Sequence, residues 1–233
     1  MAKTAKTAKT AKTAKTAKTA KTAKTSKTSK TSKTSKTSKT SKTSKTSKTS
    51  KSTLKPKIKI ENVVASAAVD AEIDLDKIAA TLDNAEYEPE QFPGLVLRLT
   101  KPKAAILVFS SGKMVCTGSK EIKTVKVAIA ETLKQIRKCG IKVKGEATIK
   151  IQNIVASSDL KSELNLDNIA FTLENTEFEP EQFPGLVFRV TDPKVVFLLF
   201  RSGKIVCTGA KKIVDVSRGV EKLVKELKKA KVL

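Results

Sequence analysis

Histidine is absent from the 233 residues of this chain. Since the imidazole group is the commonest general base near neutral pH and a frequent metal ligand, its absence argues against a hydrolytic or metal-dependent enzyme. We expect no catalytic centre, no metal and no cofactor. Cysteine is also scarce: Cys116, Cys139 and Cys207 are odd in number and have no metal-ligand spacing. We therefore expect free thiols rather than disulfides, as in the cytosol.

Long apolar runs are missing as well. None approaches the roughly 18 residues that a membrane-spanning helix requires, and the N-terminus lacks the hydrophobic region of a signal peptide. These absences predict a cytoplasmic protein with no membrane partner.

The first 53 residues contain no acidic residue and, after Met1, no hydrophobe larger than alanine. They comprise eight Ala-Lys-Thr triplets, eight Ser-Lys-Thr triplets and a short remainder, with 17 lysines in all. Such a segment cannot bury enough apolar surface to offset its chain entropy, so residues 1–53 are predicted to be a disordered, lysine-rich tail. Outside it, 30 basic and 23 acidic residues leave a net charge of +7 of the total +24.

What the chain does contain is a long internal repeat. Asn62 corresponds to Asn153 and Val115 to Val206, each at an offset of 91 residues, and the sequence EPEQFPGLV occurs identically at 88–96 and 179–187. A unit of this length exceeds the periods of helical repeats, so two copies predict one body with pseudo-two-fold symmetry. We place the first repeat at 54–146 and the second at 147–233, and we expect the ligand to be contacted by two related half-surfaces.

Each repeat has the same order of predicted elements: strand, helix, four strands, helix. In the first repeat we expect strands at 57–65, 85–88, 95–100, 104–109 and 113–118, a helix through Leu75 and Leu82, and a longer helix at 122–138; in the second repeat, the first strand is expected at 148–156, a short strand at 176–179 and the last helix at 214–229. The pattern predicts an α+β fold with about ten antiparallel strands and four helices on one face.

The strands are apolar on both faces. In the strand at 95–99, Leu95, Leu97 and Leu99 alternate with Val96 and Arg98. Four helices can cover one face only, which leaves an apolar face with basic residues and, we expect, no acid. An exposed apolar surface of that size marks a binding site, although a second layer or another copy of the chain could equally cover it.

Taken together, these motifs resemble those of the TATA-binding protein family in its archaeal form. The resemblance spans residues 58–229 and rests on motifs found once per repeat: the starts Glu61-Asn62-Val63-Val64 and Gln152-Asn153-Ile154-Val155, the Phe-Pro-Gly turns, and the Ser-Gly-Lys-(Met/Ile)-Val-Cys-Thr-Gly hairpins. It implies a saddle: a curved sheet with helices on the convex face and the minor groove of TATA-box DNA on the concave face. It also implies a transcription initiation factor, associated with the nucleoid of a cell without a nucleus, that bends promoter DNA and recruits transcription factor B and RNA polymerase.

The resemblance assigns the DNA contacts in matched pairs. Asn62, Asn153, Thr117 and Thr208 would donate to bases; Val64, Val115, Val155, Val206, Leu107 and Leu198 would pack on the groove floor; Phe92 with Phe109 and Phe183 with Phe200 would wedge into base steps; Arg98 and Arg189 would hold phosphates. The chemistry fits, because A·T pairs offer only acceptors in the minor groove whereas G·C adds an amino donor. Core packing and strand-edge hydrogen bonds are the alternative roles for the phenylalanines and asparagines.

Acidic residues in the second Pro-Glu-Gln-Phe-Pro-Gly turn, Glu179 and Glu181, resemble the site where this family docks transcription factor B. Glu88 and Glu90 occupy the same places in the first repeat, so only the family's usage favours the second. Solvated turn acids would look the same.

Two other functions stay open. One is a weakly sequence-selective architectural protein that bends DNA, with the tail supplying most of the affinity. The other is a nucleic-acid-processing enzyme, which the absence of histidine argues against. The tail itself is outside the resemblance, and we expect its lysines to contact phosphates beside the site.

Overall fold

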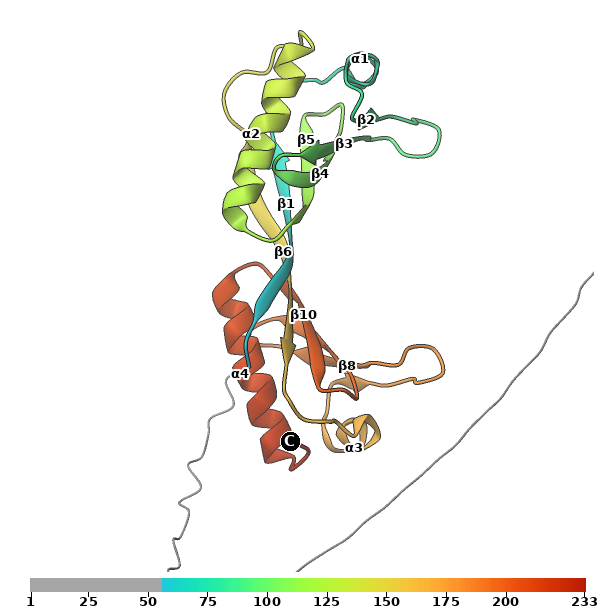
Figure 1. The fold of residues 1–233 in the computed structure, drawn as a ribbon, viewed down its shortest axis with the longest axis vertical. Helices are drawn as coiled ribbons and strands as arrows, with labels where there is room; N and C mark the ends of the chain where they lie inside the picture. Colours follow the sequence, from blue (N-terminus) through green and yellow to red (C-terminus); the bar gives the residue numbers. More distant parts are fainter. Residues whose placement is uncertain (1–55) are drawn as a thin grey trace, which may run out of the picture. The chain divides into compact units, whose positions relative to one another are not determined.

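The computed structural model describes residues 56–233, and the predicted tail at 1–53 lies outside the described residues. The predicted order of elements is confirmed in both repeats (Figure 1). The first repeat contains β1 (Lys59–Ala68), α1 (Leu75–Thr81), β2 (Ala85–Glu86), β3 (Leu95–Thr100), β4 (Lys103–Val108), β5 (Lys113–Ser119) and α2 (Ile122–Lys138). The second contains β6 (Thr148–Asp159), α3 (Leu166–Thr172), β7 (Thr176–Glu177), β8 (Leu186–Val190), β9 (Val195–Leu199), β10 (Lys204–Ala210) and α4 (Ile213–Lys229).

The ten strands form a single antiparallel sheet in the order β2-β3-β4-β5-β1-β6-β10-β9-β8-β7. At its centre the first strands of the two repeats pair with each other, with Asn62 opposite Val155 and Val64 opposite Asn153. Exchanging each strand for its equivalent in the other repeat gives the same order read from the opposite edge. The pseudo-two-fold axis therefore passes between β1 and β6. The predicted α+β fold, a curved antiparallel sheet with helices on its convex face, is confirmed.

The long helices cover one face of the sheet (Figure 1). Their buried residues recur every three or four positions, as in Ile129, Leu133 and Ile136 of α2, which gives each helix one apolar stripe. The same side of the strands is buried, and each repeat has its own core cluster, to which Ile78 of α1 and Ile169 of α3 also contribute. Helices α1 and α2 therefore share one core cluster, and α3 and α4 share the other.

The ends of several strands differ from those predicted. β1 and β6 run on to Ala68 and Asp159 because each is paired on both sides, with its counterpart and with the last strand of its own repeat. β2 and β7 are only two residues long. They are edge strands with one neighbour, and the proline-containing turn that follows ends their pairing.

Cys116, Cys139 and Cys207 are free and buried. Burial raises the pKa of the Cys116 thiol to about 11 and that of Cys207 to about 12, so neither forms appreciable thiolate near neutral pH. Within residues 56–233, no cluster of His, Cys, Asp or Glu side chains could hold a metal ion. In that same part of the chain, no helix is both long enough and apolar enough to cross a membrane.

Candidate nucleic-acid interface

The face of the sheet opposite α2 and α4 carries side chains that belong to neither core cluster. The registers align them in rows: Ser66, Val115, Leu107 and Val96 in the first repeat, and Ser157, Val206, Leu198 and Val187 in the second. All of these side chains are partly exposed. We call this surface the open face; it also carries Asn62, Val64, Thr117, Asn153, Val155 and Thr208. The structure thus brings the predicted groove-floor residues together on one surface.

The prediction that this face carries no acid is wrong. Glu86 on β2 lies opposite Val96 of β3, which places its carboxylate beside Arg98 with Nε–Oε1 and Nη2–Oε2 distances of 3.2 and 3.1 Å. Glu177 and Arg189 repeat the arrangement, with 3.1 and 3.0 Å from Nη2 to the two carboxylate oxygens. A two-residue strand shows no alternation from which this orientation could be predicted.

Arg98 and Arg189 lie on the open face, and each holds a carboxylate there. The hydrogen bond from Arg98 lowers the pKa of the Glu86 carboxyl. Both partners are well exposed, at 62% and 63% of the side chain. Ion pairs so exposed contribute little to stability, so separating this pair would cost little.

The predicted asparagine and threonine donors form one hydrogen-bonded unit in each repeat. Asn62 Nδ2 donates to Thr117 Oγ1 at 3.0 Å, and the Gly118 backbone N–H donates to Asn62 Oδ1 at 2.9 Å. Gly118 presents this N–H from a positive φ of 86°, which glycine adopts readily. The second amide hydrogen of Asn62 and the hydroxyl hydrogen of Thr117 have no acceptor in this unit, so both remain available to donate.

The second repeat builds the same unit. Asn153 Nδ2 donates to Thr208 Oγ1 at 3.0 Å and Asn153 Oδ1 accepts from Gly209 N at 2.7 Å. A longer contact of 3.3 Å lets the Thr208 hydroxyl donate back to Asn153 Oδ1. In each repeat the asparagine therefore keeps one amide hydrogen free to donate, beside the apolar side chains of Val64 and Val155.

The predicted phenylalanine pairs also meet. Phe92 and Phe109 lie with ring centroids 5.8 Å apart at 64°, and Phe183 and Phe200 at 6.0 Å and 69°, both edge-to-face. Phe92 and Phe183 are 38% and 39% exposed, as expected for residues on turns. Glycine in the Phe-Pro-Gly turn makes room for the rings, because a Cβ at Gly94 would stand 2.7 Å from Phe92 and 2.9 Å from Phe109.

Glu179 and Glu181 are exposed on the turn between β7 and β8, and Glu88 and Glu90 are equally exposed between β2 and β3. The structure therefore does not distinguish the two turns as docking sites.

Two further polar residues, Glu61 and Gln152, lie at the centre of the sheet, and no contact was predicted for them from the sequence. Each sits where a β-bulge shifts the β1–β6 register. The Glu61 carboxylate lies 2.8 Å from Lys59 Nζ and 3.0 Å from Lys120 Nζ and accepts from Ser157 Oγ at 2.8 Å. Hydrogen bonds from Lys59, Lys120 and Ser157, in that order, lower the pKa of Glu61 to about 2.

Gln152, the equivalent of Glu61, instead donates from Nε2 to Ser66 Oγ at 2.7 Å. One signal was available in the sequence: the motifs Glu-Asn-Val-Val and Gln-Asn-Ile-Val change charge only at this position.

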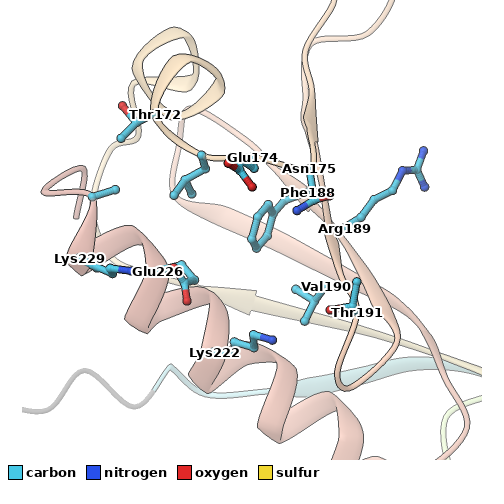
Figure 2. Close-up of a pocket in the computed structure, with 12 residues that line it drawn as sticks. Thr172, Glu174, Asn175, Phe188, Arg189, Val190, Thr191, Lys222, Glu226 and Lys229 are labelled. Atoms are coloured by element: carbon cyan, nitrogen blue, oxygen red, sulfur yellow. The ribbon is translucent and has the colours of Figure 1, made fainter.

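A separate pocket of about 560 Å³ lies between α3, β8 and α4 (Figure 2). Its polar lining includes Thr172, Lys222, Glu226 and Lys229. Lys222 Nζ donates to the backbone oxygen of Asp192 at 3.1 Å. Of the predicted DNA contacts only Arg189 lines this pocket, so it is not part of the open face.

Comparison with known proteins agrees with these features. The family model described as "Transcription factor TFIID (or TATA-binding protein, TBP)" matches residues 57–139 and again 148–230. The TATA-box-binding protein of Methanocaldococcus jannaschii is 52% identical over 180 residues, which cover 77% of this chain and 98% of that protein. That of Methanothermobacter thermautotrophicus is 57% identical over 165 residues, covering 71% and 91%.

A solved structure, Methanococcus jannaschii TBP, superposes with a TM-score of 0.70 at 53% identity and covers 75% of this chain and 99% of that one. The family model matches both repeats in turn, and the relatives are about half identical over most of the chain. The chain therefore belongs to the TATA-binding protein family, whose members are DNA-binding transcription factors and not enzymes.

Proposed function

We propose that this protein is a general transcription initiation factor that binds TATA-box promoter DNA through the minor groove. The observation that supports the proposal is the unit of Asn62, Thr117 and Gly118, repeated by Asn153, Thr208 and Gly209, which holds each asparagine oxygen and leaves one amide hydrogen available to donate. The minor groove of A·T pairs offers only acceptors, adenine N3 and thymine O2. The names of the relatives, TATA-box-binding proteins, point to the same ligand.

Exclusion of G·C pairs follows from the same surface. At the centre of the face, a guanine amino group would meet the methyl groups of Val64 or Val155, where it would lose its hydrogen bonds to water and find no acceptor. An unpaired buried donor costs about 1–3 kcal/mol. Specificity for A·T pairs thus needs no recognition of individual bases.

Bending of the DNA is the second part of the proposal. Two phenylalanines per repeat, one on a turn and one at a strand end, form partly exposed edge-to-face pairs. Apolar wedges of this kind unstack base steps and kink DNA in complexes of TATA-binding proteins. Arg98 and Arg189 would then exchange their carboxylate partners for phosphates.

Recruitment is the third part. The exposed acids Glu179 and Glu181 lie on a turn beyond the open face and suit a basic surface of transcription factor B. Through this factor the complex would reach RNA polymerase in the pre-initiation complex.

Competition binding at about 0.15 M salt, where surface charges are strongly screened, tests the proposal. The competitors are a TATA duplex, the same duplex with G·C in place of A·T, and a third with inosine·C, which lacks the guanine amino group. We expect the TATA and inosine duplexes to compete alike and the G·C duplex to compete poorly. Equal competition by all three would instead indicate an architectural DNA-bending protein with little sequence preference.

A further inference from the structure

We infer that Glu61 and Gln152 give the two halves of the open face opposite hydrogen-bonding characters, and that this difference sets which way round the protein sits on a near-symmetric site. The inference rests on the proposed binding of the minor groove. It concerns Ser66 and Ser157, two serines that the pseudo-two-fold axis makes equivalent.

Both serines belong to the open face. Ser66 lies opposite Val115, which in turn lies opposite Leu107. Ser157 lies opposite Val206, which lies opposite Leu198. Each serine therefore continues a row of proposed groove-floor residues, and each is partly exposed.

The hydrogen bonds of the two serines run in opposite directions. A carboxylate has no hydrogen to give, so Ser157 must donate its hydroxyl hydrogen to Glu61 Oε1, at 2.8 Å. The remaining lone pairs of Ser157 are left to accept. Ser66 receives a hydrogen from Gln152 Nε2 at 2.7 Å, so its own hydroxyl hydrogen is left to donate.

Glu61 is held in place as an anion. Lys59 and Lys120 approach its two carboxylate oxygens to 2.8 and 3.0 Å. The two lysines hold the carboxylate in place as an acceptor for Ser157, and their positive charges reduce its repulsion of the DNA phosphates. Gln152, being neutral, needs no such lysine pair to offset a charge.

The difference matters in the minor groove. Adenine N3 and thymine O2 accept, so they suit Ser66; a purine 2-amino group donates, so it suits Ser157. A 2-amino group under the first repeat faces a donor, whereas under the second repeat it finds an acceptor. The second repeat should therefore tolerate a 2-amino group that the first repeat rejects.

A self-complementary box of alternating T and A, with one adenine at a time replaced by 2,6-diaminopurine, isolates this effect. The replacement adds only the 2-amino group to the minor groove, and without it the box offers both orientations equally. A donor dye on Phe171→Cys and an acceptor dye at one end of the duplex report the orientation by energy transfer. Phe171 is 93% exposed on α3, at the second-repeat end of the sheet (Figure 1), and the native cysteines are buried.

We expect the wild-type protein to bind with its second repeat over the modified half more often than in the opposite orientation. At the adenine where the effect is largest, the ratio of the two orientations should be on the order of tenfold. Glu61→Gln should bring this ratio close to one, and Glu61→Gln combined with Gln152→Glu should invert it. Ser157→Ala should lower the ratio without changing charge. Glu131→Gln, on α2, removes one acidic charge away from the open face and should keep the wild-type ratio.

The outcomes separate the two proposals. If the unmodified box binds no better than a G·C duplex, the proposed function is wrong and this inference falls with it. If the box binds well but the wild-type protein shows no orientation bias, or if Glu61→Gln keeps the full bias, only the inference is overturned.

Discussion

Asn62 shows how much of the binding chemistry depends on the partners of a single residue. An isolated asparagine could present its oxygen or its nitrogen to the DNA. The N–H of Gly118 holds the oxygen, at 2.9 Å, and the nitrogen donates one hydrogen to Thr117, at 3.0 Å, which leaves its second hydrogen to donate. Glu61 acts on Ser157 in the same manner. At the scale of residues, the open face is defined by hydrogen bonds made within the protein.

The asparagines should determine specificity more than affinity. Asn62→Ala with Asn153→Ala removes donors to the central base pairs, so discrimination there should relax by about 1–3 kcal/mol for each donor removed. Arg98→Ala or Arg189→Ala should instead weaken binding to all sequences alike. Dissociation constants on a TATA duplex and a centre-substituted duplex measure both effects; an equal loss of affinity on the two duplexes for the asparagine variant would contradict this separation of roles.

Glu61 also predicts a dependence of stability on pH. Its pKa falls from 4.5 to about 2 in the folded protein, so its stabilising interactions are complete above pH 4.5 and disappear as the pH falls through about 2. Glu61→Gln should therefore lose less stability than the wild-type protein across this window. Thermal unfolding at both ends of the window and at neutral pH gives the comparison. Parallel losses in the two proteins would show that Glu61 does not contribute.

At the scale of elements, the turns between β2 and β3 and between β7 and β8 do two things at once. Each Phe-Pro-Gly turn positions one phenylalanine against another at the end of the next hairpin, and its glycine leaves space for both rings. In the same turn, two exposed glutamates precede the phenylalanine in sequence. DNA contact and partner contact are thus proposed for neighbouring residues of one short loop.

Phe183→Ala or Phe200→Ala should lower affinity for TATA DNA and reduce the bend. Without the phenylalanine ring, nothing would fill the gap between the two unstacked base pairs. Fluorescence energy transfer between the ends of the duplex measures the bend. Phe171→Ala, which removes an exposed phenylalanine of α3 that belongs to neither pair, is the matched control and should behave as the wild-type protein. A wild-type bend in both test variants would rule out wedging at this end.

The acids of the second turn should matter for the partner only. Glu179→Arg with Glu181→Arg should leave binary DNA binding nearly intact and abolish the ternary complex with transcription factor B, since two carboxylates that suit a basic surface become cations. Glu88→Arg with Glu90→Arg makes the same change in the first repeat and should retain the ternary complex. A gel-shift assay resolves both complexes. An unchanged ternary band for the second-repeat variant would place the docking site elsewhere.

At the scale of the whole molecule, two unlike regions share one chain. The described region carries the duplicated open face and a modest positive charge. The lysine-rich segment, residues 2–53, lies outside the described residues and holds 17 of the lysines. We propose that its lysines contact phosphates beside the site without recognising sequence, because lysine acts as a mobile point charge.

Deleting residues 2–53 should flatten the dependence of log affinity on log salt concentration, by about 0.9 for each phosphate that the segment neutralises. Non-specific binding should weaken most, while the preference for TATA over a mutated box stays equal or rises. Titrations of full-length and truncated protein on both duplexes at several salt concentrations decide the matter. Identical slopes would mean that the segment does not touch DNA.

The duplication, the order of the elements and the open face of β3, β4 and β5 could all be predicted from the amino-acid sequence. Alternation along a strand is local: Leu95, Leu97 and Leu99 must face one way if Val96 and Arg98 face the other. The motif that carries Asn62 and Asn153 also placed the proposed donors on the first strand of each repeat. These features depend on neighbours in the chain, so the chain alone shows them.

The pairing of residues far apart in sequence could be seen only in the folded protein. Glu86 meets Arg98 because of the β2–β3 register, and Glu61 reaches Ser157 across the β1–β6 pair at a bulge that no local pattern indicates. Alternation fixes the face on which a side chain lies but not the residue beside it. The acids on the open face, and the opposite characters of its two serines, follow from strand register and so appear only when the sheet is assembled.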